Sequence, residues 1–458
     1  MKLIYDIKDK PKFSQVIVFA IQQLLAIMAA TLVVPVIIGH GMSPVAALFG
    51  AGIGTLVYLC FTKFRSPVFL GSSFAFIGSM VTAFAGAVSM AAGYMGLIIG
   101  AVIAGLVYVI IALIVKFAGV SWLNKLMPPV VIGPTVAIIG LSLAGNAVGD
   151  LQKGDVADIL GNSVANPLIC IVCGLVALAV TVLCSTYGKK MMKLIPFIIG
   201  IIAGYAVAVV FTVIGDATDT AALMLIDFNN FKALVDSGVG LHTFIEVPDF
   251  TFVTAFKGIK DIDAGYIVTL LAAYAPVAFV VFAEHVADHK NISSIIEKDL
   301  LEDPGLHRTL LGDGVGSMAG AFFGGCPNTT YGESVACVAI TRNASVITIL
   351  TTAVMALVIA FFAPFVAFVN SIPACVMGGV CIALYGFIAV SGLKMVQKVD
   401  LEQNNNLFVV SVILVCGIGG LALNFKIGGY DINITSIACA LILGILTNIM
   451  LSKKSKED

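Results

Sequence analysis

The sequence predicts an all-α membrane protein that crosses the bilayer many times. Hydrophobic residues make up 60% of the 458 residues and charged residues only 11%, whereas soluble domains carry about 25% charged residues. The mean hydropathy of +1.08 agrees with this composition. Apolar runs of the roughly 20 residues that a helix needs to cross a bilayer recur from Val16 to Met450. Lipid, rather than water, is therefore the main solvent expected around this chain.

About fourteen such runs, separated by short polar stretches, are the predicted spans. In order, they cover residues 15–36, 43–62, 67–86, 92–117, 128–147, 166–185, 194–215, 264–287, 309–325, 329–341, 345–369, 373–393, 406–424 and 432–451. If the amino terminus is cytoplasmic, 20 of the 25 lysines and arginines fall on the cytoplasmic side. The exceptions are Lys153, Lys232, Lys257, Lys260 and Lys426. This bias is the one found in cytoplasmic membranes, and an even number of spans places both termini in the cytoplasm.

Two pairs of similar segments predict that the chain is an inverted repeat. PPVVIG (128–133) opens the fifth predicted span and PACVMG (373–378) opens the twelfth. SPVFLGSSFAF (66–76) and CPNTTYGES (326–334) interrupt the third and the tenth with proline, polar residues and glycine. Because each pair is about seven spans apart, an odd number, the two halves have opposite orientations. Inverted repeats with broken helices at matching positions are typical of transporters, with the binding site where the breaks meet.

The two broken segments also indicate a cavity. Non-helical backbone inside a bilayer is tolerated only where protein or a water-filled space covers its N–H and C=O groups. A short helix that begins after such a break directs its free N–H groups and the positive end of its dipole into that space. These groups suit a ligand that carries carbonyl oxygens.

Four acidic residues are predicted in or at the margin of spans: Glu284, Asp288, Asp313 and Glu333. A charge there costs at least about 2.5–3.5 kcal/mol, so a functional role is the first hypothesis for each. Glu333 follows the second broken segment directly. Asp313, between two glycines, is interpreted instead as a structural residue that caps or packs near the cytoplasmic side.

The stretch FAEHVADHK (282–290) has two interpretations. It is either the solvated end of a span or part of a buried polar site. Glu284 and Asp288 are four residues apart and therefore share one helix face, while His285 and His289 share a neighbouring face. Glu284 follows a long apolar run, which favours burial, and the solvated interpretation applies mainly to Asp288 and the residues after it.

Other kinds of site have little support in the sequence. Cys170 and Cys173 have the C-x-x-C spacing, but no histidine or second cysteine pair lies nearby. His285 and His289 lack an evident third ligand. We therefore expect no metal, no cofactor and no nucleic-acid partner. A membrane-embedded enzyme is disfavoured because no nucleophile–base cluster is evident, and a channel because the carboxylates are isolated and form no continuous polar pore.

Several motifs together resemble the nucleobase–cation symporter family, also called the nucleobase/ascorbate transporters, and in particular its bacterial uracil permeases. They are AEHV (283–286), DPGLHR (303–308), PNTTYGE (327–333), AITR (339–342) and LGSSFAF (70–76). The resemblance extends from ATLVVPV (30–36) to LYGF (384–387) and so covers essentially the whole chain. It implies about fourteen spans arranged as two inverted sets of seven, with short antiparallel strands in the third and tenth spans.

The resemblance also implies two domains, each built from two parts of the chain. A core domain would comprise residues 1–120 (spans one to four) and 264–371 (spans eight to eleven). A gate domain would comprise residues 121–263 (spans five to seven) and 372–458 (spans twelve to fourteen and a cytoplasmic tail).

The family's binding residues can be carried over by position. Glu284 and Glu333 resemble the two carboxylates that bind the nucleobase. Phe74 and Gly332 match positions that offer backbone N–H groups to it. The remaining pocket positions are Ala30, Ser73, Tyr331 and Tyr385. Uracil has two N–H donors and two carbonyl acceptors, so carboxylates and backbone N–H groups complement it.

By this resemblance, the chain would import uracil together with protons across the cytoplasmic membrane by alternating access, without enzymatic chemistry and as a homodimer. Asp288 and Glu284 are the expected proton carriers, because two carboxylates about 5–6 Å apart on one face are not readily ionised together. His289 is a substitute carrier, although it faces another side of the helix.

Three positions depart from the uracil permease pattern. Asp288 stands where these permeases usually have histidine, and many purine-transporting relatives have aspartate there. Xanthine or another purine is therefore the alternative substrate. Ser334-Val-Ala336 replaces the family's Asn-x-Gly, and Gln22-Gln23 replaces a Gln-His pair in the first span.

Overall fold

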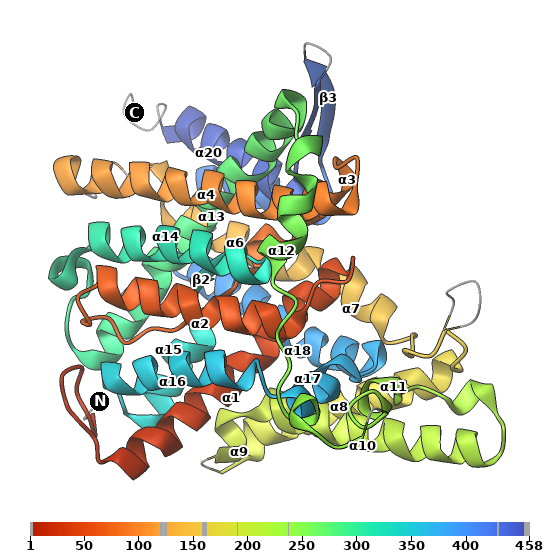
Figure 1. Cartoon of the computed structure of the whole chain (residues 1–458). Helices are drawn as coiled ribbons and strands as arrows, with labels where there is room; N and C mark the ends of the chain where they lie inside the picture. Colours follow the sequence, from red (N-terminus) through yellow and green to blue (C-terminus); the bar gives the residue numbers. More distant parts are fainter. Residues whose placement is uncertain are drawn as a thin grey trace.

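The computed structural model is mostly helical (Figure 1) and describes residues 3–119, 122, 126–157, 163–189, 191–236, 238–427 and 430–452. The expected cytoplasmic tail at 453–458 lies outside the described residues. So do Lys2, Lys125 and Lys190, three of the basic residues predicted on the cytoplasmic side. Among the residues that the structure describes, eight helices are long and apolar enough to cross a membrane, and shorter apolar helices lie between them. The prediction of a helical chain with many apolar segments is confirmed.

The first part of the chain, up to the segment before residue 264, contains the following elements. They are α1 (Phe13–Ile38), α2 (Pro44–Phe61), β1 (Leu70–Ser72), the 3₁₀ helix η1 (Phe74–Phe76), α3 (Ile77–Ala85), α4 (Met90–Ala118), α6 (Pro129–Ser142), α7 (Ala144–Asp150), α8 (Pro167–Tyr187), α9 (Met191–Leu194), α10 (Pro196–Ala217), η2 (Ala221–Leu223), α11 (Asn229–Lys232), η3 (Leu241–Thr243), α12 (Thr251–Ala255) and η4 (Phe256–Asp261).

The second part repeats the alternation of long and short helices. Its elements are α13 (Ala264–Ile296), η5 (Leu301–Gly305), α14 (Leu306–Gly324), β2 (Asn328–Thr330), α15 (Gly332–Thr341), α16 (Val346–Ile359), α17 (Ala363–Asn370), α18 (Ala374–Val396), α19 (Asn404–Ile418), β3 (Leu423–Ile427), β4 (Tyr430–Ile434) and α20 (Ser436–Ser452).

Several long helices begin at side-chain caps that the sequence encodes. Ser43 and Ser89 accept hydrogen bonds from backbone N–H groups three residues further on, at the starts of α2 and α4. Asn166 caps α8 in the same manner, and Asp263 caps α13. A side-chain oxygen at this position satisfies one of the N–H groups that a helix start leaves free. These caps explain why the observed starts of these four helices lie close to the predicted ones.

Several predicted span boundaries differ from the structure, two of them clearly. Helix α13 continues to Ile296, although the predicted span ends at 287. The predicted span 406–424 is wrong at its end, because α19 stops at Ile418 and a hairpin of β3 and β4 follows. Gly419 and Gly420 end α19, and Gly420 adopts a φ of 74°, which glycine reaches without strain.

The two broken segments pair with each other, as the resemblance implies. Strands β1 and β2 are antiparallel, with Leu70 opposite Thr330 and Ser72 opposite Asn328. The short helices that follow the strands, η1–α3 and α15, therefore leave from opposite ends of the pair. Gly71, the central residue of β1, has no room for a side chain, because a Cβ atom there would lie 2.4 Å from the ring of Tyr331.

The helices form two groups by their packing. Helix α14 packs against α2 and α4, α13 packs against α4, and α1 packs against α16 and α2. Figure 1 shows α4, α14 and α2 stacked above one another. In the second group, α18 packs against α6 and α8, α10 against α8, and α19 against α20 and α6. We retain the division into a core and a gate domain as a proposal.

The contact between α2 and α14 depends on glycine, which gives a first testable prediction. A Cβ atom on Gly50 would lie 2.4 Å from the carbonyl oxygen of Gly320, and backbone atoms cannot rotate away as a side chain can. Gly50→Ala should therefore destabilise the protein by about 1–3 kcal/mol, the usual range for overpacking. Thermal unfolding of the purified protein measures the effect.

The matched control for this variant is Gly145→Ala in α7, where an added Cβ meets no atom within 4 Å. Alanine is the better helix former, so the control should unfold at or slightly above the parental temperature. Equal unfolding temperatures for Gly50→Ala and Gly145→Ala would contradict a tight contact between α2 and α14.

Candidate functional site

The polar stretch 282–290 lies inside α13 and not at a solvated helix end. Asp288 is half-buried, and its Oδ2 accepts a hydrogen bond of 2.8 Å from the hydroxyl of Thr330 in β2. Glu284, one turn earlier on the same face, is also half-buried, and Lys290 is exposed. Of the two interpretations of this stretch, the structure supports the buried polar site. The helix continues past the polar residues because they have partners within the protein.

The strand pair brings the starts of two short helices to the same region. Phe74 is the first residue of η1, which follows β1, and Gly332 is the first residue of α15, which follows β2. The first N–H groups of a helix have no partner within it. Gly332 is exposed, and a Cβ atom built on it would meet nothing within 4 Å, so there is open space at the start of α15. The backbone at Gly332 is therefore accessible to a small molecule.

Carboxylates from different elements converge beside this space. Glu333 lies in the first turn of α15 and is half-buried. Asp313 lies near this part of α13 as well, because its carboxylate contacts His285, the residue after Glu284. The side-chain oxygens of Ser73 and Thr329, on the strand pair, are buried without a hydrogen-bond partner. The site thus combines acceptor carboxylates with free backbone donors.

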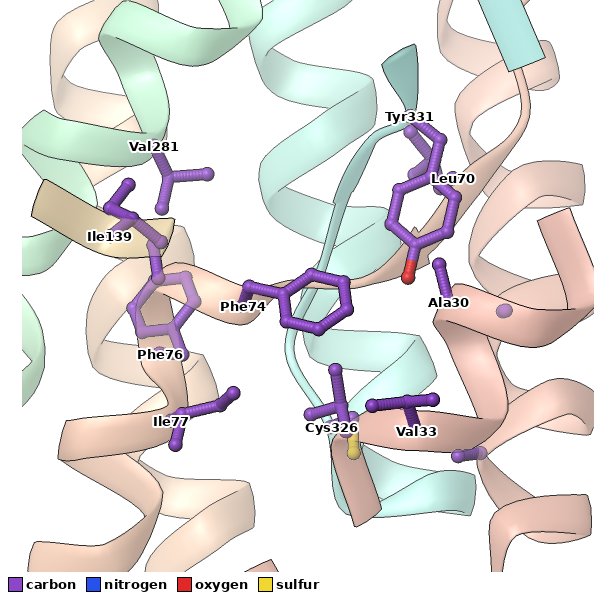
Figure 2. Close-up of a cluster of buried hydrophobic side chains, with 14 of the residues drawn as sticks. Ala30, Val33, Leu70, Phe74, Phe76, Ile77, Ile139, Val281, Cys326 and Tyr331 are labelled. Atoms are coloured by element: carbon purple, nitrogen blue, oxygen red, sulfur yellow. The ribbon is translucent and has the colours of Figure 1, made fainter. Parts of the chain in front are cut away.

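Aromatic and small side chains form the walls of the same region. The rings of Phe74 and Tyr385 lie 5.9 Å apart with an interplanar angle of 77°, so Tyr385 of α18 contacts the start of η1. The hydroxyl of Tyr385 has no hydrogen-bond partner. Figure 2 shows Ala30, Phe74 and Tyr331 in one buried hydrophobic cluster. Tyr331 is already engaged, because its hydroxyl donates to the carbonyl oxygen of Ser72 over 2.7 Å.

Of the two structural roles expected for Asp313, capping and packing, the structure shows packing inside the protein. Asp313 lies within α14 with 1% of its surface exposed, and its Oδ2 is 2.7 Å from Nδ1 of His285. Nε2 of His285 is 2.9 Å from the hydroxyl of Thr309. Sequence analysis missed this buried pair. One feature of the sequence could have indicated it: His285 stands next to Glu284 at the end of an apolar run, and a buried histidine needs a polar partner in the fold.

His289 is part of the same scaffold. Its Nδ1 donates to the carbonyl oxygen of His285 over 2.8 Å, and its Nε2 is 2.7 Å from the hydroxyl of Tyr58 in α2. Because a carbonyl can only accept, a neutral His289 carries its proton on Nδ1. The Tyr58 hydroxyl donates to the hydroxyl of Ser66 over 2.7 Å. The two histidine rings stack with centroids 4.0 Å apart. Both histidines therefore brace α13 against its neighbours.

Two of the departures from the family pattern meet in space. Gln23, which stands at the histidine position of the first span, donates to the hydroxyl of Ser334 over 2.5 Å. The backbone N–H of Phe69 donates to the same hydroxyl over 3.0 Å. Ser334 and Gln23 are both buried. The two replaced residues thus form one contact that joins α1, α15 and the segment before β1.

In the part of the chain that the structure describes, no three His, Cys, Asp or Glu side chains lie close enough together to hold a metal ion. Cys170 and Cys173 are buried free cysteines in α8.

Known proteins are similar to this chain over most of its length. A family model named Xan_ur_permease and described as "Permease family" matches residues 14–425. The chain belongs to this permease family. The uracil permease of Bacillus caldolyticus is 39% identical over 454 residues, which are 98% of this chain and 95% of the relative. The uracil permease of Bacillus subtilis (strain 168) is 36% identical over 465 residues, covering 100% and 97%. That of Escherichia coli (strain K12) is 34% identical over 446 residues, covering 96% and 92%.

The resemblance read from the motifs is therefore confirmed. Among solved structures, the permease is similar to the transmembrane domain of the cyanobacterial bicarbonate transporter BicA, with a TM-score of 0.60 and 14% identity, covering 96% of this chain and 99% of that one. It is also similar to the murine Slc26a9 anion transporter, with a TM-score of 0.59 and 12% identity, covering 98% and 69%. Such low identities establish a shared fold alone. Membership of the permease family makes this protein a multi-pass membrane transporter rather than an enzyme.

Proposed function

We propose that this permease imports uracil together with protons across the cytoplasmic membrane by alternating access. The observation that carries the proposal is the strand pair β1–β2. It brings the starts of η1 and α15 together with Glu333, beside the face of α13 that carries Glu284 and Asp288. The relatives over nearly the full chain are uracil permeases, which supports uracil as the substrate.

Each polar group of uracil has a counterpart in this arrangement. Glu284 and Glu333 accept hydrogen bonds from the two ring N–H groups, and the backbone N–H groups at Phe74 and Gly332 donate to the carbonyl oxygens. Ser73 has a buried hydroxyl without a partner and can hydrogen-bond to the same ligand. A buried polar group left unpaired costs about 1–3 kcal/mol, so a solute without matching groups is rejected.

The remaining predicted residues shape the pocket. Ala30 of α1 is almost fully buried and contributes only a methyl group to the pocket wall. Tyr331 packs against the strand pair, and Tyr385 approaches Phe74 from α18. Since Phe74 lies in the proposed core and Tyr385 in the proposed gate, the substrate would bind between the two domains. A movement of one domain against the other would then expose the site to one side of the membrane at a time.

We assign proton coupling to Asp288 with Glu284. Asp288 is half-buried, one of its oxygens is held by Thr330, and Glu284 lies one turn away on the same helix face. A proton on this group relieves the repulsion among the carboxylates. His289 is the weaker candidate, because both of its ring nitrogens have partners inside the core.

The proposed architecture is about fourteen spans in two inverted sets, with both termini in the cytoplasm. Basic residues of the predicted cytoplasmic side gather near the start of the chain. Lys298 pairs with Asp6, Arg65 pairs with Asp303, and Arg342 accepts a backbone hydrogen bond from Ile4.

Competition between nucleobases tests the choice of substrate. Uptake of labelled uracil into proteoliposomes with an inward proton gradient should be inhibited by excess 5-fluorouracil and not by xanthine. A pocket packed for one ring does not admit a bicyclic purine without strain. A protonophore provides the control, since it should abolish accumulation. Strong inhibition by xanthine with none by 5-fluorouracil would make a purine the substrate instead.

A further inference from the structure

A small internal cavity lies in the proposed core domain, between α4, α14 and β2. Its polar lining consists of four side chains: Tyr108 of α4, Asp313 and Ser317 of α14, and Asn328 of β2. The space open to the centre of a water-sized sphere is about 10 Å³. That is about the space that a single water molecule needs.

Each of these four side chains has a polar atom that lacks a hydrogen-bond partner. The hydroxyls of Tyr108 and Ser317, Oδ1 of Asp313 and Oδ1 of Asn328 are all buried without a hydrogen-bond partner. The four residues are between 1% and 6% exposed. Unpaired buried polar groups are rare in folded proteins, and four around one cavity call for a shared partner.

The four atoms match the hydrogen-bonding capacity of water. Oδ1 of Asp313 and Oδ1 of Asn328 can only accept, because the other Asp313 oxygen contacts His285 and the Asn328 amide nitrogen donates to the carbonyl of Gly50. The two hydroxyls of Tyr108 and Ser317 can donate. We propose that this cavity binds one ordered water molecule that donates to Asp313 and Asn328 and accepts from Tyr108 and Ser317.

A metal cation is the alternative ligand for four oxygens, and the donors argue against it. The Tyr108 hydroxyl has no acceptor among the protein groups around it. A cation bound to its oxygen would leave that O–H unpaired, whereas water accepts it. The carboxylate of Asp313 also already has a polar partner in His285. A neutral ligand that both donates and accepts therefore fits the cavity better.

The water molecule would connect the scaffold to the binding site. It joins α4 and α14 to Asn328, two residues before Thr330, whose hydroxyl holds Asp288. Through Asp313 it also reaches His285 on α13. Tyr108, Ser317 and Asn328 thereby become positioning residues for β2 and α13. The site itself does not depend on the identity of the transported substrate.

Two substitutions at Ser317 separate loss of a hydroxyl from loss of the water. Ser317→Ala keeps the space, so the water retains three partners and the unfolding midpoint of the purified full-length protein should fall by less than about 2 °C. Ser317→Val fills the space and expels the water. The groups of Tyr108, Asp313 and Asn328 then stay unpaired, and the midpoint should fall by about 5 °C or more.

A double variant tests whether Tyr108 and Ser317 act through the same molecule. Once Ser317→Val has removed the water, the Tyr108 hydroxyl is only an unpaired buried group. Adding Tyr108→Phe should therefore restore part of the lost midpoint. Tyr274 supplies the matched control, because its hydroxyl is also buried without a partner but is not part of this cavity. Tyr274→Phe should shift the midpoint equally in the parent and in Ser317→Val.

A high-resolution structure of the parent decides the proposal even if a variant does not fold. One density peak within about 2.7–3.2 Å of the four oxygens is expected, and its absence overturns the proposal. Additive effects of Tyr108→Phe and Ser317→Val would also overturn it. The midpoint should not change when Na⁺ is replaced by N-methylglucamine. A Na⁺-dependent rise that Ser317→Val removes would show a cation site in place of the water.

Discussion

Replacement of Glu333 by glutamine is expected to weaken uracil binding by about 10- to 150-fold, which corresponds to about 1.5–3 kcal/mol for a hydrogen bond to a charged group. Glu333 lies in the first turn of α15, directly after the exposed backbone at Gly332. Glutamine has the same size but presents an NH₂ group in place of one acceptor oxygen. That donor opposes the N–H of the nucleobase. Calorimetric titration of the purified protein with uracil measures the loss.

The control for Glu333→Gln is the same exchange at Glu302, which is exposed outside the spans. Glu302→Gln should bind uracil like the parent. The unfolding temperature of both variants should stay close to that of the parent, so that a loss of affinity is not a loss of fold. Parental affinity in Glu333→Gln would remove Glu333 from the binding site.

The strand pair shows which structural features can be predicted from local sequence and which cannot. Proline, glycine and polar residues inside an apolar run leave backbone groups that lipid cannot satisfy, so a break at Pro67 and at Pro327 follows from the sequence. The resemblance to a known family added that the breaks are short strands. The register, with Leu70 opposite Thr330, does not follow from either, because it depends on how Tyr331 packs over Gly71.

The polar partners inside the core were the largest gap in the sequence analysis. Asp313 and His285 are 28 residues apart and meet because α13 and α14 contact each other and both pack against α4. When no partner for Asp313 is known, the free-energy cost of burying its charge favours a position near solvent. The length of α13 was underestimated for the same reason. Its polar residues after Ala283 suggested a helix leaving the membrane, whereas they contact Thr330, Tyr58 and one another.

The remaining site positions could be found because the ligand's chemistry constrains them. Glu284 and Glu333 stand in apolar surroundings where a charge needs a reason, and the resemblance supplied one. The four unsatisfied atoms of the internal cavity could not be found in this way. They come from Tyr108, Asp313, Ser317 and Asn328, ordinary residues in separate segments, and only their common orientation makes a site.

The largest functional loss is expected for Asp288→Asn, which should abolish uracil accumulation while leaving binding and exchange measurable. The amide oxygen of asparagine can still accept from Thr330, so the link between α13 and β2 is kept. An amide cannot take up or release a proton in the physiological range. If one proton moves with each uracil, a gradient of 2 pH units drives an accumulation of about 100-fold in the parent. The variant should only equalise the concentrations.

Proteoliposomes separate the two activities of Asp288→Asn. Uptake under an imposed pH gradient reports coupling, and exchange of labelled uracil against preloaded uracil without a gradient reports binding and domain movement. Asp236→Asn is the matched control, since it makes the same exchange at an exposed carboxylate in a connecting segment. The control should accumulate uracil like the parent. An Asp288→Asn variant that also does so would free Asp288 from any part in coupling and leave it as a structural partner of Thr330, and the proton would then have to travel on Glu284.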